Sequence, residues 1–183
     1  MTRCPNLSYA EMDPEQQQVH DRIASGPRGS VGGPFNVLLR SPQLCQRVQE
    51  LGLFLRFESS LPGHLRELAI LVSAHHWHAE YEWYAHSRIA HAEGLDDAAV
   101  EAIRVGDDTP FEDGALQAVR EFATSLLSTG RVSDEIHDAA TVVLGDRGVV
   151  ELVGTIGYYC LVSFTLNAFE VAAPTGGNPL PDR

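Results

Sequence analysis

The amino-acid sequence predicts a single all-α domain. Strand signals are weak along the whole chain, whereas helix-start signals recur: a capping residue stands directly before a proline at three places. At 183 residues the chain is long enough to enclose one hydrophobic core, and no linker or repeat divides it. We therefore expect residues 1–183 to form one domain, with a loose tail over 174–183 where prolines and glycines gather.

Most of the expected helices begin at a capping residue or a proline. The clearest case is Asp13, which precedes Pro14 and has Gln16 where a capping box needs it. The pattern recurs at Thr109 with Pro110. In chain order, we expect helices over residues 14–24, 42–57, a third one opened by 60–62, then 110–128, 133–144 and 148–171.

The last expected helix is apolar on nearly every side, which is typical of a helix that is buried all round. Gly145 ends the helix before it. Glu151 and Asn167 interrupt the apolar run, which is shorter than the about 20 residues that a membrane span needs. We expect a buried helix that lies in the domain centre or against another subunit, and no membrane partner.

Aromatic residues in and after that helix suit a subunit interface as well as a core. They are Tyr158, Tyr159, Phe164 and Phe169. The sequence therefore favours a homo-oligomer.

The composition excludes several classes of function. A formal net charge of −12 makes a nucleic-acid partner unexpected. The basic residues are all arginine, so no lysine Schiff base can form. The three cysteines, Cys4, Cys45 and Cys160, are too widely spaced for a disulfide framework and fit a reducing compartment. The N-terminus has no signal pattern, and we expect a cytoplasmic protein.

The candidate site lies in the segment 79–86. Ala79, Glu82 and His86 share one helical stripe, and Glu82 lies one turn from His86. A carboxylate beside an imidazole orients the ring, as a proton-transfer site requires. The alternative is a surface ion pair worth about a few tenths of a kcal/mol.

Glu67 joins this group only if the chain turns back. It lies fifteen residues before Glu82, which in one straight helix would separate the two by about 22 Å. The histidine-rich run from His75 to His78 is a poor helix former. We predict a helix break between His75 and Ala79 that brings Glu67 back toward His86.

Two other readings of the basic residues are open. The three imidazoles of His75, His76 and His78 suggest a metal site, above all His78 together with Glu82 and His86 at intervals of four residues. Ligands spread over two turns of one straight helix rarely converge on one ion, and we expect no metal. Arginines could instead clamp a carboxylate, or form surface salt bridges. The candidates are Arg40, Arg66 and Arg88. The glycine-rich segment 26–33 has no lysine after it and is not a phosphate-binding loop.

These residues resemble the carboxymuconolactone decarboxylase family, within the alkylhydroperoxidase D-like superfamily. The resemblance rests on the segments 33–36, 39–42, 66–71, 79–90, 92–95, 157–159 and 167–170. It implies an alkylhydroperoxidase D-like helical bundle and a symmetric oligomer, a trimer or a hexamer.

The resemblance also bears on the chemistry. The peroxidase branch has a glutamate, a C-x-x-C pair and a histidine. Glu67 and His86 match the first and last positions, but Ala79 and Glu82 stand at the cysteine positions. Thiol peroxidase activity is therefore not expected.

What remains resembles the decarboxylase branch, which needs no cofactor and acts on a small molecule. The resemblance implies that His86 donates the proton while Glu82 orients it and Glu67 acts as a second relay. Arg40 is the expected carboxylate clamp, and His78, Tyr81 and Tyr84 are the other expected substrate-binding residues. A divergent isomerase or hydrolase, and a non-catalytic oligomeric binding protein, are the alternatives.

Overall fold

The computed structural model describes residues 2–182, and every regular element in this range is helical, as predicted. Met1 and Arg183 lie outside the described residues. The elements are η1 (Tyr9–Glu11), α1 (Pro14–Ser25), α2 (Pro34–Leu38), α3 (Pro42–Leu53), the π-helical η2 (Phe54–Glu58), α4 (Gly63–Trp77), α5 (Glu80–Ala92), α6 (Asp97–Val105), α7 (Gly114–Thr129) and α8 (Asp134–Ala168).

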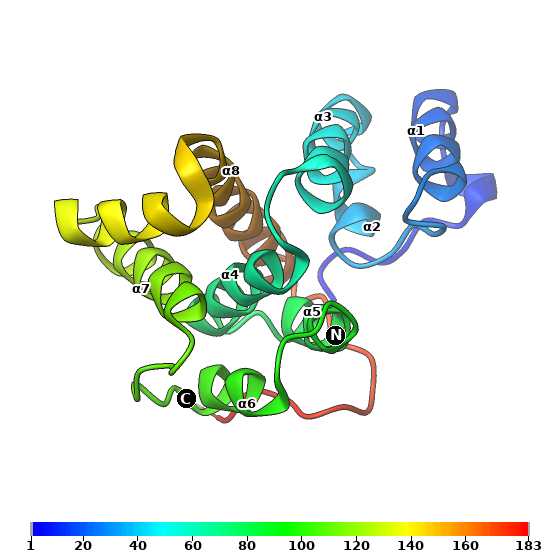
Figure 1. Cartoon of the computed structure of the whole chain (residues 1–183). Helices are drawn as coiled ribbons and strands as arrows, with labels where there is room; N and C mark the ends of the chain where they lie inside the picture. Colours follow the sequence, from blue (N-terminus) through cyan, green and yellow to red (C-terminus); the bar gives the residue numbers. More distant parts are fainter. Residues whose placement is uncertain (1, 183) are drawn as a thin grey trace.

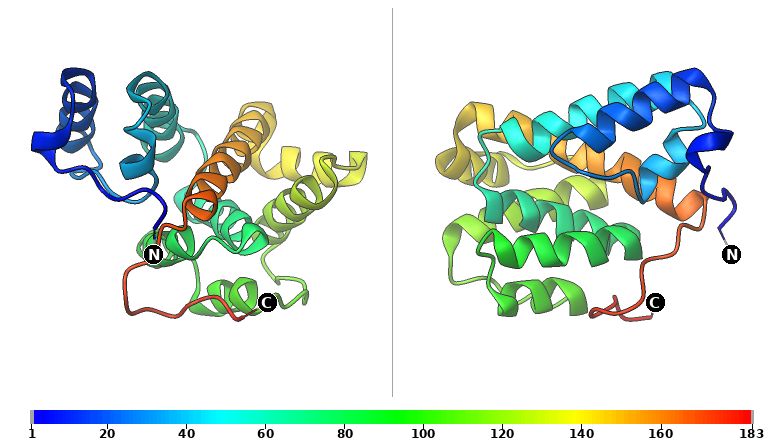
Figure 2. Two further views of the ribbon diagram at one scale, coloured as in Figure 1. Left: turned by 180° about the vertical axis from the view of Figure 1, so that it is seen from behind. Right: turned by 90° about the vertical axis from the view of Figure 1, so that its right-hand side faces the viewer.

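Helix α4 is the centre of the domain. It packs against α5, α7 and α8 (Figure 1), and its residues from Leu65 to Ala74 are all buried. Helices α1, α2 and α3 form a separate lobe, which packs on the C-terminal half of α8 (Figure 2). The hydrophobic core accordingly has two clusters, one around α4 and α7 and one between the lobe and α8. A site at the border of the two clusters can draw side chains from both.

Several helix starts follow the sequence signals. Asp13 Oδ1 accepts a hydrogen bond from the Gln16 backbone N–H at 2.9 Å, and the Gln16 side chain accepts one from the Asp13 N–H at 2.9 Å. Gly145, with φ 68° and ψ 170°, interrupts α8 at the point where two helices were expected to meet. The bend between the yellow and orange parts of α8 is visible in Figure 1.

The predicted start at Pro110 is wrong, because α7 begins at Gly114. The Asp107 carboxylate accepts hydrogen bonds from both the backbone N–H and the hydroxyl of Thr109, which holds this segment in a turn. Asp113 is the residue that caps α7, accepting from two backbone N–H groups. Thr109 therefore belongs to the turn that precedes α7 and does not cap the helix.

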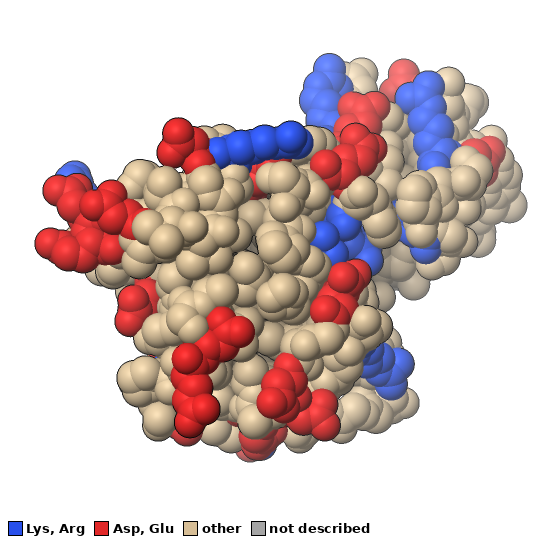
Figure 3. All heavy atoms as spheres, viewed as in Figure 1, with Lys and Arg blue, Asp and Glu red and all other residues tan. Residues whose placement is uncertain are grey.

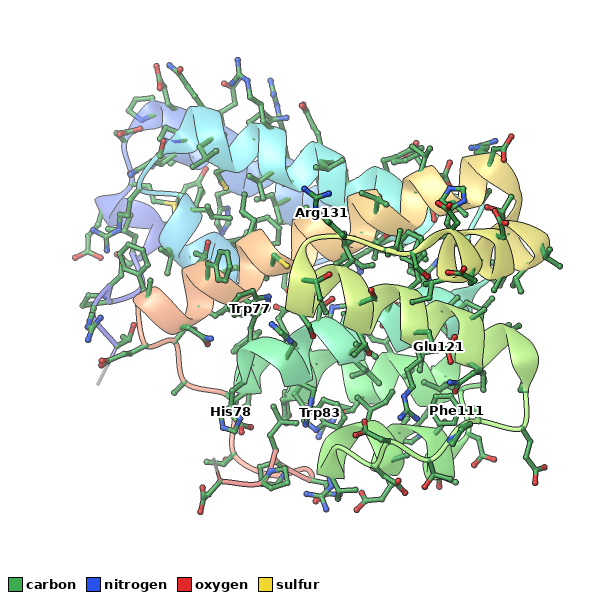
Figure 4. All side chains as sticks on the ribbon, turned by 90° about the vertical axis from the view of Figure 1, so that its left-hand side faces the viewer. Trp77, His78, Trp83, Phe111, Glu121 and Arg131 are labelled. Carbon is green, nitrogen blue, oxygen red and sulfur yellow. The ribbon has the colours of Figure 1, made fainter. Side chains whose placement is uncertain are left out.

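The predicted break between α4 and α5 is confirmed. His78 adopts the left-handed conformation, with φ 51° and ψ 48°, and the Ala79 N–H donates to the Ala74 carbonyl at 2.8 Å. Figure 4 shows His78 at this turn, next to the C-terminal segment. Since α5 turns back along α4, Glu67 and His86 come together.

The C-terminal segment is less loose than expected. It has no regular secondary structure, but the Asn178 carbonyl accepts a hydrogen bond from Trp83 Nε1 at 2.9 Å and the Pro179 carbonyl accepts one from Arg104 at 3.1 Å. Leu180 is 5% exposed and belongs to the core. The segment therefore runs across α5 and α6 (Figure 2), and hydrogen bonds to Trp83 and Arg104 hold it there.

Helix α8 differs from the expectation that it is buried all round. It keeps an exposed apolar face, made by Val150, Val153, Leu161 and Phe164. It is also the one described helix that is long and apolar enough to cross a membrane, but 56% of its most apolar window is buried inside the domain. That is the pattern of a core helix with one open face.

Candidate active site

An imidazole held between two carboxyl groups forms the centre of the site. His86 Nδ1 lies 2.6 Å from Glu67 Oε2, and His86 Nε2 lies 3.3 Å from Glu82 Oε2. Glu67 comes from α4, whereas Glu82 and His86 lie one turn apart on α5. All three are at most 4% exposed. The three side chains that the sequence singled out are therefore in direct contact.

The two carboxyl groups are in opposite electrostatic environments. Burial alone raises the pKa of Glu67, but the charge and hydrogen bond of His86 and the charge of Arg66 outweigh it, so the pKa is lowered. Arg66 Nε lies 3.4 Å from Glu67 Oε1. Burial dominates at Glu82 and raises the pKa of that carboxyl. Glu67 is thus the ionised acceptor of the Nδ1–H, and Glu82 retains its proton to higher pH.

This group opens on a cavity of about 360 Å³ between the lobe and the rest of the domain. Both Glu82 and His86 line it, whereas Glu67 lies behind His86 and does not. The cavity walls come from the segment 26–33, α2, η2, α5 and α8. They comprise Arg28, Ser30, Gly32, Pro34, Phe35, Arg56, Tyr81, Glu82, Ala85, His86, Ile89, Tyr158, Tyr159 and Val162. The Tyr159 ring packs edge-on against His86, with centroids 4.9 Å apart. The Glu82 carboxyl and the His86 imidazole therefore face a cavity whose other walls are mainly aromatic residues and two arginines.

Of the four expected substrate-binding residues, only Tyr81 lines this cavity. Its ring lies against Gly33, where a Cβ would collide with it and where φ is 55°. Tyr84 lies on the opposite side of α5 from Glu82, because two residues turn a helix by about 200°. There the guanidinium of Arg88 stacks on its ring at 4.4 Å.

Arg40 and His78 are also displaced from the cavity. Arg40 is exposed and donates to the Pro5 carbonyl at 2.6 Å, because the short helix α2 ends just before it and turns it outward. His78 lies in the turn after α4, with Nε2 3.6 Å from Glu80 Oε1. The expectation that these two residues bind the substrate is not supported by their positions. Residues 2–182 hold no group of three or more His, Cys, Asp or Glu side chains placed to bind a metal ion.

Two arginines that the sequence did not single out, Arg28 and Arg56, line the cavity, whereas Arg40 does not. Arg28 comes from the glycine-rich segment after α1, and Arg56 comes from the π-helical turn η2. Neither segment has a periodic pattern that fixes where a side chain points. Tyr158 and Tyr159 were noted as interface candidates, and the structure places both in the cavity wall.

No cysteine lines the cavity among the described residues. Burial raises the pKa of the Cys45 thiol to about 12. Burial also raises the pKa of Cys160, whose sulfur accepts a hydrogen bond from Trp77 Nε1 at 3.2 Å. Because the thiolate is the reactive form, these environments disfavour thiol chemistry.

No protein-family model matches the sequence, and no curated protein matches it. Solved structures do match, over nearly the whole chain. A peroxidase-related protein from Silicibacter sp. TM1040 is 14% identical, with a TM-score of 0.76 over 95% of this chain and 93% of that one. A protein with the alkylhydroperoxidase AhpD core from Ralstonia eutropha JMP134 is 15% identical, with a TM-score of 0.79 over 95% and 93%.

A third solved structure is an enzyme with a ligand. A variant of the debrominase Bmp8, in complex with 2,3,4-tribromopyrrole, is 16% identical, with a TM-score of 0.75 over 96% of this chain and 93% of that one. At such identities the likeness is one of fold. The chain therefore has the all-helical fold of the AhpD-like proteins.

Proposed function

We propose that the protein is an enzyme that transfers protons to a small unsaturated carboxylic acid or lactone, in the manner of a carboxymuconolactone decarboxylase and without a cofactor. The observation that carries this proposal is the buried His86, held between carboxyl groups with opposite pKa shifts at the wall of a cavity. A pair of titratable groups whose environments push their pKa values apart is typical of acid–base sites.

The proposed reaction has two steps. The bond between the departing carboxylate and the ring carbon breaks, CO₂ leaves, and the electron pair moves through the conjugated system onto the lactone carbonyl oxygen. Tyr81, whose side chain lines the cavity, can donate a hydrogen bond to that oxygen. A proton then returns to carbon from the Glu82–His86 pair.

The geometry divides the roles differently from the sequence-based expectation. Glu82 lines the cavity and holds its proton, so it acts as a donor together with His86 and does more than orient the ring. Glu67 is a positioning residue, because it contacts the Nδ1 side of the His86 ring and does not line the cavity. The bromopyrrole bound by the debrominase supports the view that this fold can enclose a small planar ring.

The test is product analysis in D₂O with γ-carboxymuconolactone and a panel of related unsaturated lactone acids. We expect CO₂ release and one deuterium per product molecule. Deuterium exchange without CO₂ would support the isomerase alternative. Binding without either would support the non-catalytic alternative and contradict the proposal.

A second arm examines thiol chemistry. The wild type should not reduce cumene hydroperoxide in the presence of a dithiol, since no cysteine lines the cavity. A Cys160→Ala variant should release CO₂ at the wild-type rate. Loss of activity in that variant would show that a thiol takes part.

We also propose that the chain forms a homo-oligomer, a trimer or a hexamer. Val150, Val153, Leu161 and Phe164 make a continuous apolar face on α8, with exposed fractions from 39% to 71%. An apolar face of this kind is typical of a subunit interface.

A further inference from the structure

The cavity is lined by two guanidinium groups that form no close ion pair, although the charges of both act on the buried Glu82 carboxyl. Among the ion pairs of the described residues, neither Arg28 nor Arg56 takes part in one. Each instead lies over an aromatic ring, Arg28 at 4.6 Å from the centre of Phe35 and Arg56 at 5.0 Å from that of Phe57. Arg66, behind the same site, shows the contrast, because it contacts two carboxylates.

Polar atoms near Arg28 are incompletely paired. Nε and Nη2 of Arg28 and Oη of Tyr158 are buried and have no well-aligned partner among the described residues, although Arg28 lies close enough to Tyr158 to act on its hydroxyl as a hydrogen-bond donor. Buried donors are normally satisfied, because leaving them unpaired carries the full cost of desolvation. Because both side chains line the cavity, an anion that enters it can supply further acceptors to them.

The backbone is shaped to bring these groups together. A Cβ at Gly52 would collide with Tyr158 Oη and with Arg28 Nη2, so only glycine leaves room for both at this position of α3. Arg56 lies in the π-helical turn that follows α3, and such turns occur often at functional sites. Gly52 thus leaves room for Arg28 and Tyr158, and the π turn carries Arg56 to the same cavity.

The charge balance of the cavity favours an anion. Glu67 already has two partners, a hydrogen bond with His86 and an ion pair with Arg66. Burial raises the pKa of Glu82, which leaves that carboxyl without charge over a wider pH range. Two positive charges therefore remain in the hollow of a chain whose net charge is −12. Figure 3 shows arginine side chains in the hollow between the α1–α3 lobe and the rest of the domain.

We propose that Arg28, Arg56 and Tyr158 form a carboxylate-binding subsite, which holds the substrate with its reactive carbon toward Glu82 and His86. Guanidinium groups bind carboxylates through paired N–H donors, and Tyr158 adds a further donor. This inference rests on the proposed function and names the anchor that it requires.

The chemistry also says which carboxylate is held. Pairing the departing carboxylate with two arginines would stabilise the ground state more than the transition state and slow its loss. The anchored carboxylate is therefore one that remains in the product. A substrate of this site carries a second carboxylate beside the one that it loses.

The experiment measures binding and needs no turnover. The probes are furan-2-carboxylate and benzoate, each beside its neutral amide, titrated into the full-length protein by calorimetry. We expect both carboxylates to bind and the amides to bind at least about tenfold more weakly, as for hydrogen bonds to a charged group. Arg28→Gln and Arg56→Gln should each weaken carboxylate binding by about 10- to 100-fold.

Matched controls separate this inference from the proposed function. Arg40→Gln removes an exposed arginine outside the cavity and should leave binding unchanged. His86→Gln should still bind the carboxylates even if it has lost all turnover. Where Arg28→Gln does not fold, Arg28→Lys keeps the charge but not the paired donors and should bind more weakly than wild type.

Three results would overturn the subsite. The first is failure of both carboxylates to bind the wild type. The second is equal binding of carboxylate and amide. The third is unchanged binding in the Arg28 and Arg56 variants, or an equal loss in Arg40→Gln. Binding that persists without any CO₂ release would refute the proposed function and leave the subsite standing.

Discussion

At position 82 a glutamate faces the cavity. Its carboxyl lies 3.3 Å from His86 Nε2, and the residue is 4% exposed. In the proposed function this carboxyl supplies the proton while it stays in contact with the imidazole.

The raised pKa of Glu82 has a consequence for stability. Below the pKa of an unfolded glutamate, about 4.3, both states are protonated. Above it the unfolded chain releases this proton and the folded chain keeps it, so the free energy of unfolding falls as pH rises toward the folded pKa. Glu82→Gln removes this dependence.

We therefore expect Glu82→Gln to gain stability relative to wild type between pH 4 and pH 7.5. The measurement is urea denaturation of both proteins at the two pH values. Glu67, whose pKa is lowered, contributes the opposite slope in both proteins and cancels in the difference. A difference that stays constant or reverses its sign would contradict the account of Glu82.

At the scale of the elements, the two breaks at His78 and Gly145 set the geometry of the domain. The first turns α5 back along α4 and brings Glu67 to His86. The second divides α8, so that its C-terminal half can carry Tyr158 and Tyr159 to the cavity. Both breaks were predictable, because a poor helix-forming run and a glycine stop mark them in the sequence.

Gly145→Ala tests the second break. The φ of 68° and ψ of 170° at this position are nearly exclusive to glycine, and no atom lies within 4 Å of a Cβ built there. Gly145→Ala should therefore lower the free energy of unfolding by about 1–3 kcal/mol through backbone strain alone, as chemical denaturation would measure.

Gly114→Ala is the matched control. Gly114 is the first residue of α7 and also has open space around it, but its φ is not positive. This variant should be as stable as wild type or gain up to about 1 kcal/mol in chemical denaturation. Equal losses in the two variants would refute the strained break.

Arg28 and Arg56 show why other parts of the site could not be predicted. The helical stripe of Glu82 and His86 fixes the direction of those side chains, and the break at His78 fixes their partner. Arg28 lies in an irregular loop and Arg56 in a π turn, where no period relates position to direction. Arg40 was favoured instead because it follows an apolar segment, and that segment forms a short helix that turns it outward.

At the scale of the whole molecule, the acidic surface and the apolar face of α8 have separate uses. The net charge of −12 favours solubility. The α8 face is the part of the described surface where an apolar stripe runs along one helix, and it lies apart from the cavity mouth, since none of its four residues lines the cavity.

This separation gives a prediction about assembly. A Val150→Arg, Leu161→Arg double variant should be monomeric, because burying two unpaired charges in an interface is unfavourable. Light scattering coupled to size-exclusion chromatography measures the mass. The wild type should run as a trimer or a hexamer, and Glu112→Arg, outside this face, should not change it. A monomeric wild type would contradict the interface.

The most direct test of the proton-transfer site is the decarboxylation rate of His86→Gln against that of wild type, on the substrate that the panel identifies. Gln keeps the approximate size and hydrogen bonding of the side chain but cannot donate a proton to the substrate carbon. We predict a loss of about 10²- to 10⁴-fold in kcat, with the fold and the binding of carboxylates retained. A variant that turns over at the wild-type rate would show that the imidazole between the two carboxyl groups does not carry the reaction.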